Sequence, residues 1–241
     1  MKLISAFLVF VTISASAFAE TQNNAAPAPR PAAPIVNIPH SSRTKGNFSD
    51  IALDFMLTKL FEKQKGVKIT YDFLESSFSD RTVAFKNLTV SPERDSLKGV
   101  IRLGLVRLNL KDLLDFIDTG AMTVAQIDAS NVKISLDFYE NGQKVRSYLA
   151  GADNVKIDQM TQPLNTAETV VTENMLIFST TQVKNGRLYI PQTKERFAAQ
   201  SVIMKDFTVY LSGDKHISLK SANIDGKTAT TIDEMKKLLM Q

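Results

Sequence analysis

An alternation of apolar and polar residues near the middle of the chain sets the strongest limit on how it can fold. Val132, Ile134, Leu136 and Phe138 alternate strictly with polar residues. A period of two is that of a β-strand with one buried face. The sequence therefore predicts a half-buried strand here, and a domain that is mainly β.

The apolar positions change parity in two earlier stretches. Val83 and Phe85 share one parity, whereas Leu88 and Val90 share the other, and a second change falls within 101–110. A slip of one residue turns every side chain to the opposite face of a sheet. The two changes therefore predict bulges or sharp bends that keep one face apolar, and so a curved antiparallel sheet or β-groove.

The predicted strands supply a set of inward-facing residues, including an early strand over 67–73. These residues can form either a closed core or a lipid-facing groove, and the sequence leaves both open. The candidates are Val67, Ile69, Tyr71, Phe73, Val83, Phe85, Ile101, Leu103, Val132, Ile134 and Leu136.

Helices are expected on both sides of the sheet region. Apolar residues recur near helical spacing over 48–65, which predicts an N-terminal amphipathic helix that either packs on the sheet or touches a membrane. The capping box of Thr231 and Glu234 predicts a short C-terminal helix. Between strands, 110–119 is expected to be a helical link, and its three aspartates are interpreted as a solvated face rather than a calcium site.

Turn signals predict three hairpins. Asn141-Gly142 and Asn185-Gly186 each stand between strand-like runs, and a third hairpin is expected to pair 207–211 with 217–219. The segment 161–173 is polar and is expected to form a loop. Four short stretches, KNLTVS, SNVKIS, DNVKID and KDFTVYLS, suggest successive strands that are entered through similar turns.

The N-terminal region indicates export. Residues 1–19 combine Lys2, an apolar run and a small-x-small site, as a cleaved signal peptide does. A Pro- and Ala-rich stretch over 20–46 predicts a disordered spacer, which leaves 47–241 as a single domain. The chain has no cysteine, so no disulfide, thiolate metal site or lipid-modified cysteine is available. We expect a periplasmic or secreted protein.

Charge and composition narrow the partners and the chemistry. The isoelectric point near 9.1 allows peripheral contact with anionic membrane, whereas nucleic acid is an unsuitable partner for an exported chain. The two histidines, His40 and His216, show no relation to a nucleophile, and no phosphate loop or zinc spacing is present. We therefore expect no catalytic residues, no metal and no cofactor.

The sequence resembles the AsmA-like superfamily of bacterial envelope proteins. The resemblance lies in the strand 67–73, FKNLTVS at 85–91, the leucine-rich link 110–117 and GAMTVAQIDASNVKISL at 120–136. Members of that superfamily have an N-terminal anchor and a long apolar β-groove, and are implicated in phospholipid transport or outer-membrane upkeep. The resemblance implies a groove that shelters acyl chains, and the shorter chain with a cleavable leader favours a single module or shuttle.

Two functions follow as expectations. The first is a non-enzymatic envelope protein that binds or helps transport phospholipid or glycolipid in an apolar groove. The second is a structural or interaction module that docks an envelope protein through a sheet edge or the Pro-rich spacer.

Overall fold

The computed structural model describes residues 44, 48–62, 66–119, 123–161, 175–210 and 217–240. The predicted signal peptide, most of the predicted spacer, the predicted loop 161–173 apart from Thr161, and both histidines lie outside these residues. The described helices are α2 (Phe48–Glu62), α3 (Leu110–Thr119) and α4 (Ile232–Leu239). The strands are β1 (Val67–Thr70), β2 (Phe73–Ser77), β3 (Thr82–Arg94), β4 (Leu97–Asn109), β5 (Thr123–Glu140), β6 (Gln143–Thr161), β7 (Met175–Ile190), β8 (Glu195–Tyr210), β9 (Ile217–Ile224) and β10 (Lys227–Ala229).

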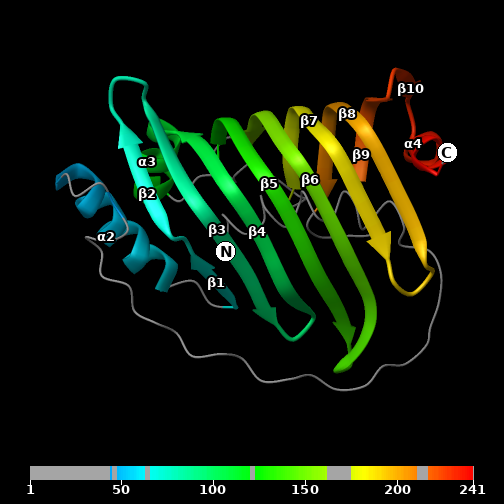
Figure 1. Ribbon diagram of the computed structural model, residues 1–241, viewed down its shortest axis with the longest axis horizontal. Coiled ribbons are helices and arrows are strands. Elements are labelled where there is room, and N and C mark those ends of the chain that lie inside the picture. Colours follow the sequence, from blue (N-terminus) through cyan, green and yellow to red (C-terminus); the bar gives the residue numbers. More distant parts are fainter. Residues whose placement is uncertain are drawn as a thin grey trace, which may run out of the picture.

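The strands form one antiparallel sheet of ten strands, which confirms the predicted curved β fold (Figure 1). From β3 onward each strand pairs with the next along the chain, and β1 and β2 both pair with β3. In the part of the chain that is described, β10 pairs only with β9, so the curved sheet does not close into a barrel. One face carries the buried apolar side chains and is called the inner face; the opposite one is the outer face.

The parity changes seen in the sequence lie on one line that crosses the sheet. Asn87, Asn131 and Asn185 have φ of 51° and stand in β3, β5 and β7, at the points where the inward-facing parity switches. The strands between them place Gly104 and Asp153 on the same line, because the cross-strand register is constant on both sides of it. The predicted bends are therefore confirmed, as an aligned kink of neighbouring strands.

A second kink line crosses the other part of the sheet. Gln159 in β6 and Asp206 in β8 have φ of 52° and 46°, and Ser179 of β7 lies between them. The Ser179 hydroxyl donates to Gln159 Oε1 at 3.1 Å, which ties the line together. The two kink lines divide the inner face into three bands. Along a strand, the inward-facing residues change between odd and even numbers at each kink line, so the apolar side chains of all three bands stay on the same side of the sheet.

The repeated stretches of the sequence mark these kinks. Asn87 of KNLTVS, Asn131 of SNVKIS and Asp206 of KDFTVYLS have positive φ inside long strands. The expectation that they enter strands through turns is therefore wrong. Asn and Asp tolerate left-handed backbone geometry wherever it occurs, so they serve a kink as well as a turn.

The predicted hairpin at Asn141-Gly142 is confirmed, whereas the one at Asn185-Gly186 is wrong. Asn141 and Gly142 both have positive φ, of 51° and 77°, as a two-residue type I′ turn requires. At the other pair only Asn185 has positive φ, so β7 bends there and continues. The pairing of Phe207 with Leu219 confirms the third hairpin, whose turn lies outside the described residues.

We predict that the kink at Asn131 requires a residue that accepts positive φ. Asn131→Gly should leave the free energy of unfolding within about 1 kcal/mol, whereas Asn131→Val should lower it by about 1 to 3 kcal/mol. Urea unfolding compares the two. Ser135→Val, at an exposed position of the same strand, is the control and should be neutral. Equal stability of Asn131→Val and Asn131→Gly would show that the kink is not held by local geometry.

Helix α2 packs at the β1–β2 edge of the sheet rather than across its inner face. Its buried residues include Asp50 and Asp54 as well as Leu57, whereas Phe55 and Met56 are exposed. The predicted amphipathic character is therefore not confirmed. Buried acids on the packed side and exposed apolar residues elsewhere explain why a simple apolar stripe does not describe this helix.

The two predicted shorter helices are present. In α3, Leu110 and Leu113 are buried, and Asp112 accepts a hydrogen bond from the Ala125 N–H at 2.6 Å. At α4, the Thr231 hydroxyl accepts from the Glu234 N–H at 3.2 Å, as the capping box predicts. The Glu234 carboxylate accepts instead from the backbone and side chain of Thr230, and these hydrogen bonds lower the pKa of Glu234.

Candidate functional site

The band between the two kink lines carries a continuous apolar surface on the inner face. It consists of two lines of direct cross-strand neighbours, each crossing the seven strands from β3 to β9, or about 29 Å at the usual strand spacing. The first line is Val83, Leu108, Ile127, Ile157, Thr181, Met204 and Ala222. The second line is Phe85, Val106, Ala129, Val155, Val183, Val202 and Ile224.

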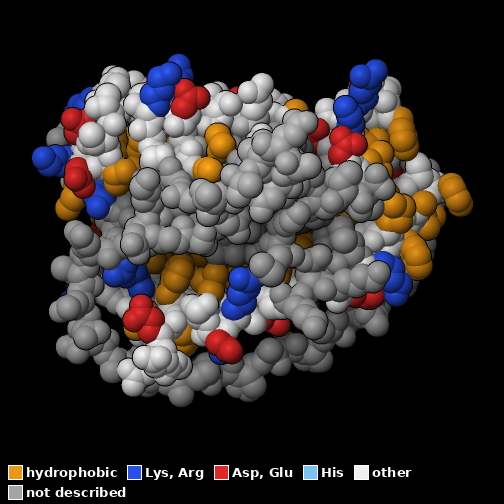
Figure 2. All heavy atoms as spheres, turned by 180° about the vertical axis from the view of Figure 1, so that it is seen from behind, with side chains coloured by type: hydrophobic (Ala, Val, Ile, Leu, Met, Phe, Trp, Pro, Cys, Tyr) orange, Lys and Arg blue, Asp and Glu red, His pale blue; other side chains and the backbone are white. Residues whose placement is uncertain are grey.

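The bands on either side extend the apolar surface along the strands. Toward one end lie Leu88, Val90, Ile101, Leu103, Val132, Ile134, Leu136, Ala152, Leu188 and Phe197. Toward the other end lie Met160, Phe178 and Phe207, of which the two Phe rings stack in parallel with centroids 4.4 Å apart. On the side that faces away in Figure 1, hydrophobic side chains are visible in separate patches (Figure 2).

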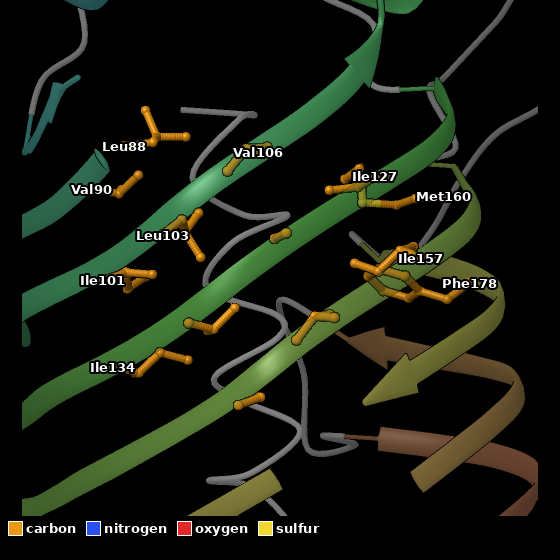
Figure 3. Close-up of a cluster of buried hydrophobic side chains, with 14 of the residues drawn as sticks. Leu88, Val90, Ile101, Leu103, Val106, Ile127, Ile134, Ile157, Met160 and Phe178 are labelled. Carbon is orange, nitrogen blue, oxygen red and sulfur yellow. The ribbon is translucent and has the colours of Figure 1, made fainter. Parts of the chain in front are cut away.

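Side chains from several strands point to the same side of the sheet (Figure 3). Ile127 of β5, Ile157 of β6 and Phe178 of β7 approach one another there, although they lie far apart in the sequence. Along β6 the inward-facing positions run from Tyr148 to Met160, or about 40 Å of extended chain. The candidate site is this inner face.

The described helices make their main contacts with strands on either side of β6 and β7. The main contacts of α2 are with β1 and β2, those of α3 with β3–β5, and those of α4 with β8–β10. Among the described residues, no helix makes a main contact with β6 or β7. Helix α2, within the predicted helix over 48–65, therefore does not cover the whole apolar face, because it lies at one edge of the sheet.

Thr181 is the one hydroxyl in the central lines of the inner face. It stands between Ile157 and Met204 and is fully buried, and its Oγ1 has no hydrogen-bond partner among the residues that the structure describes. A buried hydroxyl without a partner costs about 1 to 3 kcal/mol. The inner face therefore contains a polar atom that would gain from an occupant with a hydrogen-bonding group.

Most of the residues expected from the sequence lie on the inner face. Val83 and Phe85 belong to the central band, whereas Ile101, Leu103, Val132, Ile134 and Leu136 belong to one flanking band. Val67 and Ile69 are buried on β1, at the edge of the sheet. The structure thus brings nine of the candidates to one apolar surface.

The predicted strand over 67–73 is broken between β1 and β2, which takes Tyr71 and Phe73 out of the regular alternation. Tyr71 is nevertheless buried in the same core as the inner-face residues. The Tyr71 hydroxyl donates to Asp54 Oδ1 of α2 at 2.6 Å, and its ring packs edge-on against Phe85 at 5.2 Å. Phe73 is half-buried, with Lys86 Nζ 5.0 Å from its ring centroid, and Leu74 takes the buried position instead. Tyr71 thus joins α2 to the sheet.

Sequence reasoning missed the half of the inner face that β6–β9 provide. Val155, Ile157, Val202 and Met204 alternate as clearly as the predicted strands do, but parity changes at both kink lines shorten each run. Recognising DNVKID as a kink, rather than a turn, would have joined the runs on either side of Asp153 into one strand, β6.

A smaller buried cluster lies at one end of the inner face. It comprises Tyr148, Leu188, Ile190 and Phe197. Burial raises the pKa of Tyr148, and Arg146, whose Nη1 donates to the phenol oxygen at 3.3 Å, partly offsets the effect. The phenol therefore stays neutral at physiological pH and acts as a packing group with one polar tip.

The described residues contain no group of three or more His, Asp or Glu placed to hold a metal ion. Within these ranges, none of the helices has the length and apolar run that crossing a bilayer requires. A scan against protein-family models finds no match for the chain, and a search of curated proteins finds none either.

Proposed function

We propose that this protein is a non-enzymatic envelope protein, exported and AsmA-like, that holds the acyl chains of a lipid against the inner face and supports outer-membrane upkeep. The observation that carries the proposal is the apolar surface that spans seven strands, together with the unpartnered hydroxyl of Thr181 within it. An apolar sheet face has to be covered by apolar groups. An acyl chain is the cover that we propose for the lipid-bound state.

The energy of such binding is adequate. Burying each methylene contributes about 0.8 kcal/mol, so about twelve buried methylenes contribute roughly 10 kcal/mol. Association costs on the order of 4 to 15 kcal/mol in lost freedom. One chain therefore gives weak or moderate binding and two chains give tight binding, which favours a diacyl lipid.

Thr181 makes the proposal testable. In the ligand-free protein, Thr181→Val should raise the free energy of unfolding by about 1 to 2 kcal/mol, because it removes a buried hydroxyl without a partner. If an ester oxygen of bound lipid accepts from that hydroxyl, the same change should weaken binding of an ester-linked phospholipid about threefold to tenfold. Displacement of a fluorescent phospholipid from purified protein compares the lipid affinity of Thr181→Val with that of wild type.

An ether-linked phospholipid of equal chain length is the matched control ligand, because it lacks the ester carbonyl. Wild type should prefer the ester lipid, and Thr181→Val should bind both lipids alike. No uptake of either lipid by wild type would overturn the proposed function. Equal uptake of the ester and ether lipids by wild type would show that the Thr181 hydroxyl takes no part in lipid binding.

The alternative is an interaction module, and the α2–β2 edge favours it. The Ser76 N–H donates to Asp50 Oδ1 at 2.9 Å, which places the start of α2 beside the end of β2. Phe48, two residues before Asp50, is 88% exposed, and Phe78, two residues after Ser76, is 64% exposed. Co-purification at native abundance separates the two functions, since a stoichiometric protein supports docking and a bound lipid supports the first proposal.

A further inference from the structure

The outer face of the sheet carries more cations than carboxylates. Several of the carboxylates are also already paired, as Asp158 is with Lys156 at 3.6 Å. The outward-facing cations of the strands are Lys68, Lys86, Lys98, Arg102, Arg107, Lys133, Lys144, Lys156, Lys184, Arg187, Arg196 and Lys205, against the carboxylates Glu75, Glu93, Asp128, Asp137 and Asp158. The kink lines add Asp153, Asp206 and Lys220.

Two adjacent lines of this face contain no carboxylate between β4 and β8, in the part that the structure describes. Both are made of direct cross-strand neighbours, and together we call them the basic strip. One line is Arg102, Lys133, Gly151, Arg187 and Ala198. The other is Val100, Ser135, Leu149, Tyr189 and Arg196.

The fold does not use the charges of the strip for its own stability. Arg102 and Lys133 stand directly opposite each other, an arrangement that destabilises a strand pair. Among the described residues neither forms an ion pair. Arg187 has one exposed and long ion pair, with Asp153 at 3.8 Å. The strip therefore holds cations whose charge is available to a partner.

Apolar groups lie among these cations. Leu149 is 43% exposed, and Arg196 lies over the ring of Tyr189 with its guanidinium carbon 5.3 Å from the centroid. A depression of about 550 Å³ lies here, lined by Lys133, Leu149 and Gly151 among others. Cations interleaved with an exposed leucine and a tyrosine are the side chains that suit a lipid headgroup region.

The size of the strip decides between kinds of partner. Five strands and two residue lines span roughly 20 Å by 10 Å, far less than the about 800 Å² that each side of a stable protein interface buries. We propose that the basic strip is a docking surface for anionic phospholipid membranes, which brings the protein reversibly to a bilayer. This goes beyond holding an acyl chain and uses the opposite face of the sheet.

The expected affinity is modest and depends on salt. Each Lys or Arg near an anionic bilayer strengthens binding roughly fivefold, and the effect falls off within a Debye length. Removing two cations should therefore weaken binding about 25-fold at low salt. At high salt the difference between wild type and the variant should largely disappear.

The test is co-sedimentation of purified protein with vesicles of phosphatidylcholine alone or with about a third phosphatidylglycerol. Arg102→Gln with Lys133→Gln is the informative variant, because it breaks no ion pair among the described residues and relieves a like-charge contact. The control is Lys68→Gln with Lys205→Gln, which makes the same charge change at exposed positions outside the strip.

We expect wild type and the control to bind anionic vesicles alike and the strip variant to bind about 25-fold more weakly. Equal binding of neutral and anionic vesicles, unchanged binding of the strip variant, or an equal loss in the control would each overturn the proposal. Uptake of monomeric fluorescent lipid, measured in parallel, should be unchanged in the strip variant. Failure of docking is thereby distinguished from failure of the proposed lipid binding.

Discussion

Gly99→Ala is expected to lower the free energy of unfolding by about 3 to 5 kcal/mol. Gly99 has φ of 149° and pairs with Leu136 of β5. A Cβ at this position would lie 2.1 Å from the Ser135 carbonyl oxygen and 2.9 Å from the Leu136 Cα. Backbone atoms cannot move aside as a side chain can, so β4 and β5 would have to separate.

Gly142→Ala is the matched control for this prediction. Gly142 also has positive φ, of 77°, but an added Cβ there would meet no atom within 4 Å. Only the backbone cost of about 1 to 2 kcal/mol applies. Urea unfolding of both variants measures the difference. If Gly99→Ala is as stable as Gly142→Ala, the close approach of β4 and β5 does not exist in solution.

Val183→Lys is expected to reduce binding of a fluorescent phospholipid at least tenfold. Val183 lies half-buried in the central band of the inner face, between Val155 and Val202. A lysine there presents an ammonium to any bound acyl chain, and removing that charge from water costs several kcal/mol. Partial exposure of the position leaves the long side chain room to reach water, so the fold should survive.

Gln182→Lys is the control, because it adds the same charge one residue away on the outer face. It should bind lipid as wild type does. Val183→Ser provides a second variant without a charge, with a smaller expected loss, in case Val183→Lys unfolds. Normal lipid uptake by Val183→Lys in a folded protein would exclude the central band as the acyl site.

Much of the fold follows from the alternation of apolar residues. The strands around Val83, Ile101 and Ile134 are recognisable because each keeps one parity over several residues, and parity alone assigns a face. The change of parity at Asn87 predicts a bend without revealing that neighbouring strands bend on the same line. That alignment depends on cross-strand register, which distant parts of the chain determine together.

The error at Asn185 has a local physical cause. An Asn-Gly pair favours positive φ at one or both residues, and the sequence does not tell which. Two positive values reverse the chain, as at Asn141 and Gly142, whereas one value only kinks it. The sequence signal identifies a residue that tolerates unusual geometry, and the neighbouring strands decide how that geometry is used.

The candidate site is predictable only in part for the same reason. The inward-facing residues of β3–β5 are evident from the sequence, but their continuation through Ile157, Thr181 and Met204 depends on strand order. The basic strip is even less predictable from the sequence. Arg102 and Lys133 lie about thirty residues apart in the sequence, and only the pairing of β4 with β5 makes them neighbours.

The central claim is that the inner face holds a lipid, and native mass spectrometry of protein purified gently from its own cells, without detergent, tests it most directly. We expect the intact protein to carry an added mass that fragments to a diacyl lipid, and to lose it after exchange into organic solvent. A protein that shows only its own mass, and that stays unchanged after incubation with phospholipid, would contradict the account.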